Sequence, residues 1–264
     1  MLIKEYNELL SISDNVFSSY NMDIIAYFDI ETTGFDKDED SIILISFGKF
    51  NNKNFCIKQY YAETLDDEKN ILNSFLIDLK SYSTWCSYNG IAFDEPFIVS
   101  RMERHNISLS IPKNHIDLYR NIRPYYKQLG MERCNLKGVE RYIGIDRKDK
   151  IDGGISVDLY KEFLITGESK LKEIIMLHNY EDVLNLPKIH EFIFEVENNK
   201  NLVRENVITD KQLNYLKSLL KKNNILLNIE LEKMSKKAAS RTIDQILKGC
   251  RDRDELNNII NNSY

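Results

Sequence analysis

Two carboxylates stand two residues apart, at Asp29 and Glu31, directly after an apolar run that begins at Ile24. Side chains repeat every two residues along a strand, so both carboxylates point to the same face. Carboxylates held side by side repel each other unless they share a proton or a cation. The five residues before Asp29 are apolar or aromatic, which indicates a strand in the core. The pair therefore predicts a site for a proton or a cation at the end of a buried strand.

A third carboxylate, Asp94, follows another predicted strand, Thr84–Tyr88, after an Asn-Gly turn. Pro96 lies close behind it, and Asp is a preferred residue at the start of a helix, so Asp94 can act as a helix cap. Ligands also bind at the carboxyl ends of strands in α/β sheets. The two roles are compatible.

A histidine and a fourth carboxylate, His178 and Asp182, lie four residues apart in the longest helical pattern, Leu171–Glu197. Residues at this spacing share one face of a helix. Taken alone, the pair is typical of an exposed ion pair worth about 0.2–0.5 kcal/mol.

Together, the four acids predict a different chemistry. Oxygen ligands with no cysteine nearby suit Mg²⁺ or Mn²⁺ better than Zn²⁺. Two such ions about 3.5–4 Å apart can hold the attacking and leaving oxygens of a phosphoryl transfer. A histidine beside them can take the proton from the attacking water.

The elements that must position these residues follow from hydrophobic periodicity. Three strands, at 24–28, 41–50 and 54–62, are separated by short polar turns and predict a meander of hairpins. Two later strands are predicted at 84–88 and 115–117. Helices are predicted at 66–82, after Pro96, after 117, from a cap at Asn135, over 156–164 and at 171–197, with Pro187 as a candidate kink. This order favours an α/β fold with a mixed sheet and helices on its faces.

The C-terminal part of the chain has a different character. Thr209–Gln212 is a capping-box sequence followed by leucines at helical spacing, and a second helix is predicted from Ser235 to Leu247, ending at Gly249. Residues 201–264 carry 12 Lys/Arg and 8 Asp/Glu, whereas the whole chain has a net charge of −5. We therefore expect a main domain at 1–200 and a small helical module at 206–264, with the boundary between Asn198 and Thr209. The basic face of this module is either a surface for nucleic acid or a partner, or a solvated face that keeps it soluble.

Composition and cysteine usage bear on the compartment. The four cysteines form no CxxC pair and read as reduced thiols. No stretch approaches the roughly 20 apolar residues that span a bilayer, and the N-terminus lacks the core of a signal peptide. These features predict a cytoplasmic chain with no membrane partner. The acidic main domain can still bind a polyanion where bound metal ions neutralise its carboxylates.

The motif segments resemble those of the DEDD (DnaQ-like) 3′–5′ exonuclease superfamily. Residues 28–34 (FDIETTG) resemble its first motif, residues 89–94 its second and residues 178–182 its third, in the family's order. The stretches 115–118 and 135–137 look most like the YprB-type branch. The resemblance spans roughly residues 22–198 and implies a ribonuclease H-like fold.

The resemblance also implies an activity, a cofactor and a partner. It implies a 3′–5′ exonuclease that hydrolyses phosphodiesters with two divalent cations, Mg²⁺ or Mn²⁺, held on Asp29, Glu31, Asp94 and Asp182. The partner would be a nucleic acid with a free 3′ end, and DNA is favoured. A 3′–5′ exoribonuclease and a catalytically weak nucleic-acid-binding scaffold are the alternatives. The sequence does not indicate which protein, if any, is a partner.

The third motif departs from the family pattern at the histidine. One branch has His five residues before the last Asp, and another has Tyr four residues before it. This chain has His178 at the four-residue spacing and Leu177 at the five-residue position. One helical residue is a rotation of about 100°, so the two positions cannot serve interchangeably. We expect His178 to act as the general base, whereas Tyr180 points elsewhere.

Five further residues resemble substrate contacts of the first and second motifs: Thr32, Thr33, Gly34, Asn89 and Phe93. The first three would offer backbone and hydroxyl groups to the terminal nucleotide, Asn89 would hydrogen-bond it, and Phe93 would stack or pack. For each residue a purely structural role, in a turn or in the core, explains the residue type equally well.

Overall fold

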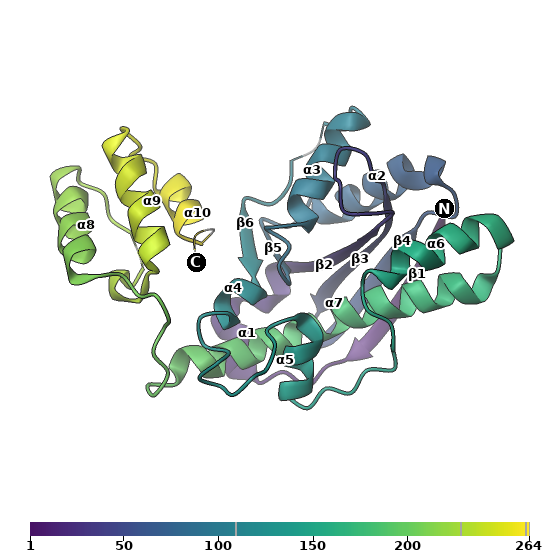
Figure 1. The fold of residues 1–264 in the computed structure, drawn as a ribbon, viewed down its shortest axis with the longest axis horizontal. Coiled ribbons are helices and arrows are strands. Elements are labelled where there is room, and N and C mark those ends of the chain that lie inside the picture. Colours follow the sequence, from purple (N-terminus) through teal and green to yellow (C-terminus); the bar gives the residue numbers. More distant parts are fainter. Residues whose placement is uncertain (109, 228, 262, 264) are drawn as a thin grey trace. The chain divides into compact units, whose positions relative to one another are not determined.

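The computed structural model describes residues 1–108, 110–227, 229–261 and 263, and it divides into two compact units (Figure 1). The first unit contains Met1–Tyr119 and Arg133–Glu195, and the second contains Arg120–Glu132 and Val196–Tyr264. The sequence had assigned 120–132 to the main domain. In the structure the Gln128 side chain bonds both the amide and the carbonyl of Val203, and the Glu205 amide donates to the carbonyl of Pro124. These bonds tie the segment to the C-terminal part of the chain.

The first unit is built on a six-stranded sheet in the order β1-β4-β3-β2-β5-β6. Strands β1 to β4 pair antiparallel, whereas β5 and β6 run parallel to β2. The predicted meander followed by parallel strands is therefore confirmed. The strands are β1 (Leu2–Leu9), β2 (Ile25–Thr32), β3 (Ile42–Asn51), β4 (Asn54–Tyr61), β5 (Thr84–Ser87) and β6 (Asn114–Asp117). Strand β1 was not predicted, because it is an edge strand whose side chains are mostly exposed and form no apolar run.

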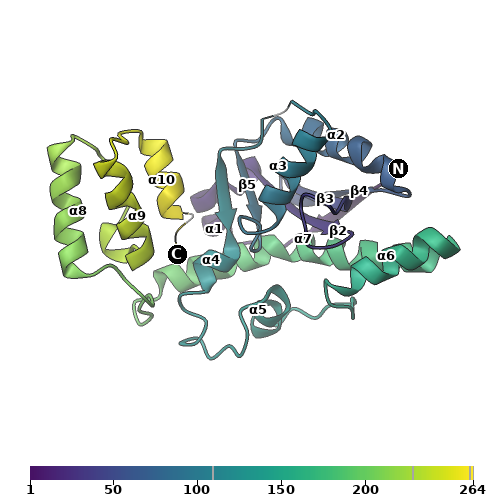
Figure 2. The ribbon, with the colours of Figure 1, turned by 45° about the horizontal axis from the view of Figure 1, so that its top comes forward.

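Helices cover both faces of this sheet (Figures 1 and 2). Helices α2 (Glu68–Leu79) and α3 (Asp94–Arg104) lie on one face, and the long α7 (Ser169–Asn198) crosses the other. The other described helices before residue 199 are α1 (Asp14–Tyr20), α4 (Leu118–Ile122), α5 (Leu136–Tyr142), α6 (Ile155–Thr166) and the short 3₁₀ turns at Met22–Ile24 and Leu65–Asp67. The Asn135 side chain caps α5 at the Gly138 amide, as predicted.

Successive side chains of strand β2 point to opposite faces of the sheet, and the two faces differ in their surroundings. Phe28 and Ile30 enter the hydrophobic core under α2 and α3. Tyr27, Asp29 and Glu31 point to the opposite face, where each meets a side chain of α7. The predicted sharing of one face by Asp29 and Glu31 is confirmed, and that face belongs to α7.

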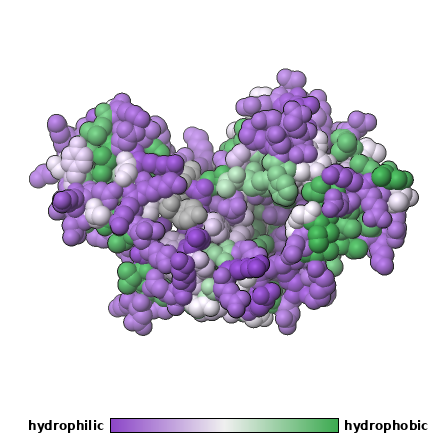
Figure 3. Space-filling model, in the orientation of Figure 1, coloured by the Kyte–Doolittle hydropathy of each residue, from purple (hydrophilic) through white to green (hydrophobic). Residues whose placement is uncertain are grey.

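The second unit contains α8 (Asp210–Lys222), a 3₁₀ turn (Leu231–Lys233), α9 (Lys236–Leu247) and α10 (Arg253–Asn261). Thr209 and Gln212 form the predicted capping box, and Ser235 caps α9. The unit has its own core, which includes Ile208, Leu216, Leu219, Leu220 and Ile246. On the face drawn in Figure 3 the C-terminal helices present mainly hydrophilic residues. One lysine of this basic unit, Lys217, pairs with Glu232 at 2.6 Å.

None of the helices in the described part of the chain combines the length and the apolar composition that crossing a bilayer requires.

A buried ion pair fastens α2 and α3 to the sheet. The Glu68 carboxylate accepts the Ile42 amide of β3 at 2.7 Å and both the Nε and Nη2 groups of Arg101 at 2.7 Å. His105 Nε2 lies 2.7 Å from the same carboxylate. Burial alone would raise the pKa of Glu68, but the bonds from Arg101 and His105 lower it below its ordinary value. The carboxylate thus stays charged and holds three elements together.

Replacing Arg101 with Ala leaves the Glu68 charge buried and largely uncompensated. We expect a loss of about 3–5 kcal/mol in the free energy of unfolding, measured by urea denaturation at pH 7. The control is Arg104→Ala on the same helix, where an exposed arginine bonds the carbonyl of Asp38 and its loss should cost about 0.5 kcal/mol. Equal losses for the two variants would contradict a structural role for the pair.

Candidate functional site

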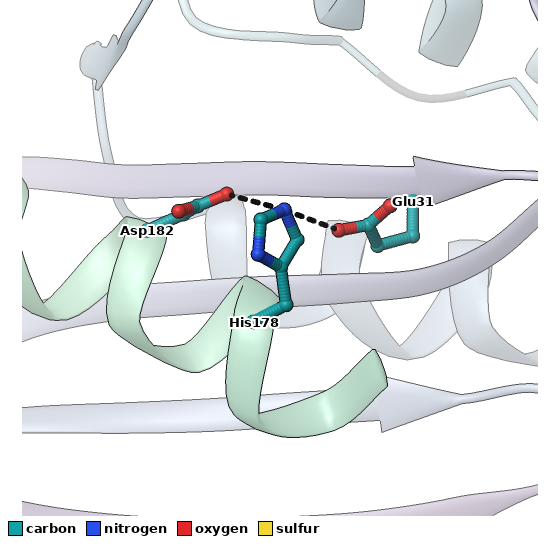
Figure 4. Close-up of side chains that lie close together, drawn as sticks. All are labelled: Glu31, His178 and Asp182. Carbon is teal, nitrogen blue, oxygen red and sulfur yellow. Dashed lines mark ion pairs between the residues drawn. The ribbon is translucent and has the colours of Figure 1, made fainter. Parts of the chain in front are cut away.

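The end of β2 and the middle of α7 bring three predicted site residues together. His178 lies between Glu31 and Asp182, with Nε2 at 3.8 Å from Glu31 Oε1 and 3.6 Å from Asp182 Oδ2 (Figure 4). All three residues are buried. One atom from each lies within 4.8 Å of the other two, an arrangement that could hold a metal ion.

The two remaining carboxylates lie beside this group. Asp94 is the first residue of α3, and its Oδ1 accepts the Ile30 amide of β2 at 3.2 Å, which places it next to Asp29. Burial raises the pKa of Asp94 to about 7, with Asp117 and Asp182 contributing and the Ile30 amide opposing. Burial, followed by the charges of Asp94, Asp182 and Glu31, raises the pKa of Asp29 well above its ordinary value.

A buried relay of polar side chains fixes Asp29 against α7. The Asn179 amide donates to Asp29 Oδ2 at 2.7 Å, and the Ser46 hydroxyl of β3 bonds the Asn179 oxygen. Gln59 of β4 in turn donates to the Ser46 hydroxyl and to the Met176 carbonyl, both at 2.9 Å. Asn179 was not predicted from the sequence. It directly follows His178 on α7, and its side chain points toward the sheet.

A loop carboxylate, Asp149, holds the other side of the His178 ring. Asp149 Oδ2 lies 2.7 Å from His178 Nδ1, 2.9 Å from Lys137 Nζ and 3.2 Å from Arg147 Nη2. Its Oδ1 accepts the Ile151 amide at 2.9 Å. Burial would raise the pKa of Asp149, but the bonds from His178 and Lys137 lower it to about 2. Asp149 therefore stays ionised and accepts a hydrogen bond from Nδ1.

The same loop also brings a cation, Arg147, against one of the predicted metal ligands. Arg147 contacts Asp182 Oδ1 and donates to the His178 carbonyl at 2.9 Å. It also pairs with the buried Glu140 at 3.0 Å, whose pKa is raised by burial in spite of this partner. The segment 146–152 (DRKDKID) reads in sequence as a solvated polar turn, so nothing in its pattern indicates these buried contacts.

The predicted substrate contacts of the first motif form a closed turn. The Thr32 hydroxyl donates to the Gly34 carbonyl at 2.5 Å, and the Thr33 hydroxyl donates to Asp40 at 3.1 Å while accepting the Ser41 amide. Gly34 leaves no room for a Cβ because the Asp40 carboxylate fills that space. These contacts supply the structural role for the three residues, and their substrate role stays a prediction.

The second motif forms a strained turn beside Asp94. Asn89 has a left-handed backbone with φ 64°, and its amide donates to Asp117 at 2.8 Å. Phe93 packs against Phe97, with ring centroids 5.3 Å apart, and against the exposed Phe35 at 6.2 Å. Tyr180 points away from the site and bonds Glu8, as expected from its position.

The donor set fits divalent cations. Among the described residues, no lysine or arginine lies within 4.0 Å of Asp29, Glu31 or Asp94. Burial, and then the Asp182 charge, raises the pKa of Glu31 well above its ordinary value, so the site disfavours its own charges. A bound cation removes this penalty, and carboxylate oxygens are the ligands that Mg²⁺ and Mn²⁺ prefer.

Asp94 gives a pH-dependent test of this repulsion in metal-free protein. A carboxyl whose pKa is raised in the folded state adds most to the free energy of unfolding below its ordinary pKa of 3.8. This stabilisation is lost as the pH rises towards 7. In EDTA we expect Asp94→Asn to exceed wild type in free energy of unfolding by roughly 2–4 kcal/mol at pH 8 and by much less at pH 4.5. The exposed Glu162→Gln is the control. A pH-independent difference in urea titrations would contradict the assignment.

Comparison with known proteins agrees with this architecture. The family B DNA polymerase from the hyperthermophilic archaeon Pyrobaculum calidifontis matches with a TM-score of 0.50 and 15% identity, over 86% of this chain and 27% of the polymerase chain. At that identity the match shows the fold alone, and it confirms the ribonuclease H-like mixed sheet with helices and C-terminal helices. No curated protein matches the sequence. A family model described as the RNase_H superfamily matches residues 26–194, and the chain belongs to this superfamily.

Proposed function

We propose that the chain is a metal-dependent 3′–5′ exonuclease of the DEDD type, acting on nucleic-acid phosphodiesters with DNA as the favoured substrate. One observation carries the proposal. Four carboxylates from β2, α3 and α7 lie close together, with Glu31, Asp94 and Asp182 buried and Asp29 half-buried, and three of the four have no lysine or arginine near them among the described residues. Membership of the RNase_H superfamily supports a nucleic acid as the substrate class.

The residues of the chain divide the work of such a reaction. Asp29, Glu31, Asp94 and Asp182 would hold two divalent cations. When bound, these ions stabilise the charge that develops on the attacking and leaving oxygens. The Nε2 atom of His178 faces the same space, so it can either take a proton from the attacking water or bind an ion. Asn179 and Arg147 keep Asp29 and Asp182 in place against their mutual repulsion.

Removing one ligand should abolish hydrolysis without unfolding the chain. We expect Asp29→Ala to lose activity on end-labelled DNA with Mg²⁺ or Mn²⁺, while its circular dichroism spectrum and melting stay cooperative. Tyr180→Phe is the matched control, because Tyr180 lies on α7 but bonds Glu8 outside the site. Wild-type activity in purified Asp29→Ala would rule out the proposed ligand set.

The direction of digestion tests the 3′ polarity separately. A 5′-labelled single strand should shorten progressively from its far end, giving a ladder of labelled products. The same assay on labelled RNA distinguishes the exoribonuclease alternative, since faster RNA digestion would replace DNA as the substrate. Early release of the 5′ label as a mononucleotide would show the opposite polarity and contradict the proposal.

A further inference from the structure

The histidine at the unusual spacing has two possible partners for its Nε2 atom, a water molecule or a metal ion. A general base must hold the water by a hydrogen bond of about 2.6–3.2 Å. A ligand must instead lie at bonding distance from the ion, next to the other ligands. The contacts around the ring distinguish these two roles.

The Nδ1 atom of His178 already has a hydrogen-bond partner. Its partner, Asp149 Oδ2, also receives the Lys137 ammonium and the Arg147 guanidinium, and neither group can accept a proton. Asp149 is therefore an acceptor at this position, and Nδ1 must donate. In the neutral ring, the lone pair then lies on Nε2.

The Nε2 side is buried, and among the described residues it has no hydrogen-bond partner. Nε2 lies 3.8 Å from Glu31 Oε1 and 3.6 Å from Asp182 Oδ2, and both distances are beyond hydrogen-bond length. A lone pair aimed at two carboxylates is repelled unless a cation lies between them. The ring is thus held in an orientation that only a cation, or a second proton, makes favourable.

The spacing of the three atoms suits a shared ion. Atoms bound about 2.1 Å from one ion lie about 3.0–3.4 Å apart in octahedral or tetrahedral sites. The observed 3.6 and 3.8 Å approach that spacing, and the three atoms lie within 4.8 Å of one another. Ligands at i and i+4 on one helix face can converge on a single ion, as His178 and Asp182 would.

We propose that His178 is a direct metal ligand with Glu31 and Asp182, positioned by Asp149, and that this site selects Mn²⁺ over Mg²⁺. The inference rests on the proposed function for the presence of divalent ions. It differs from the expected general-base role, because the nitrogen would bind the ion instead of the water. Imidazole suits first-row transition ions, whereas Mg²⁺ favours an all-oxygen shell that retains several waters.

The test measures metal binding directly and needs no turnover. Mn²⁺ and Mg²⁺ binding to the full chain would be measured by titration calorimetry, and pulsed electron paramagnetic resonance would detect nitrogen bound to Mn²⁺. Wild type should bind Mn²⁺ more tightly than Mg²⁺ and show an imidazole nitrogen coupling. His178→Ala and the bulkier His178→Gln should lose that coupling and the preference for Mn²⁺.

The positioning residue and the control complete the design. Asp149→Ala should weaken Mn²⁺ binding by about 10–100-fold, the usual effect of removing a carboxylate that orients a ligating histidine. Tyr180→Phe should bind Mn²⁺ like wild type and keep the nitrogen coupling.

Two results would overturn the inference. They are a wild type without nitrogen coupling, and a His178→Ala variant that binds Mn²⁺ as tightly as wild type but turns over slowly, as a general-base variant would. Nitrogen-coupled Mn²⁺ in a wild type that hydrolyses no nucleic acid would contradict the proposed function and leave this metal site standing.

Discussion

Mutual repulsion among the buried carboxylates at the end of β2 is the constraint that the rest of the first unit has to withstand. Asp29, Glu31, Asp94 and Asp182 come from three elements, and burial raises the pKa of the first three. A site of this kind persists only if its frame is rigid. The apolar face of β2 supplies much of that frame, because Phe28 and Ile30 are packed under α2 and α3. The Glu68–Arg101 pair then fastens those helices to β3.

The polar contacts around the site separate two kinds of acid. Glu140 and Asp149 receive cations from the chain itself, through Arg147 and Lys137, and they serve to orient Asp182 and His178. The Asp29 carboxylate receives a neutral amide, that of Asn179, and no described lysine or arginine pairs with it. The chain therefore supplies cations to its supporting acids and to Asp182, whereas Asp29, Glu31 and Asp94 have no lysine or arginine within 4.0 Å among the described residues. This division explains how an acidic protein can present a site that attracts polyanions once metal is bound.

The sequence predicted what depends on local periodicity. The two-residue period placed Asp29 and Glu31 on one face, and the helical period placed His178 and Asp182 together. Contacts between distant segments had no such signal. Asp149 and Arg147 lie in a short charged stretch that reads as a solvated turn, and only the fold places that loop over α7. The role of Asn179 was not predictable for the same reason, since its partners Ser46 and Asp29 lie more than a hundred residues away in the sequence. The four-residue spacing between His178 and Asp182 can be read from the sequence, but the role inferred for His178 depends on its contact with Asp149.

Anomalous diffraction from crystals soaked in Mn²⁺ tests the central claim, that this cluster is built to hold divalent cations. We expect a Mn²⁺ peak at bonding distance from Glu31, Asp182 and His178 Nε2, with Asp29 and Asp94 next to the occupied site. Mn²⁺ bound only at surface carboxylates, with the cluster protonated or closed by Arg147, would contradict it.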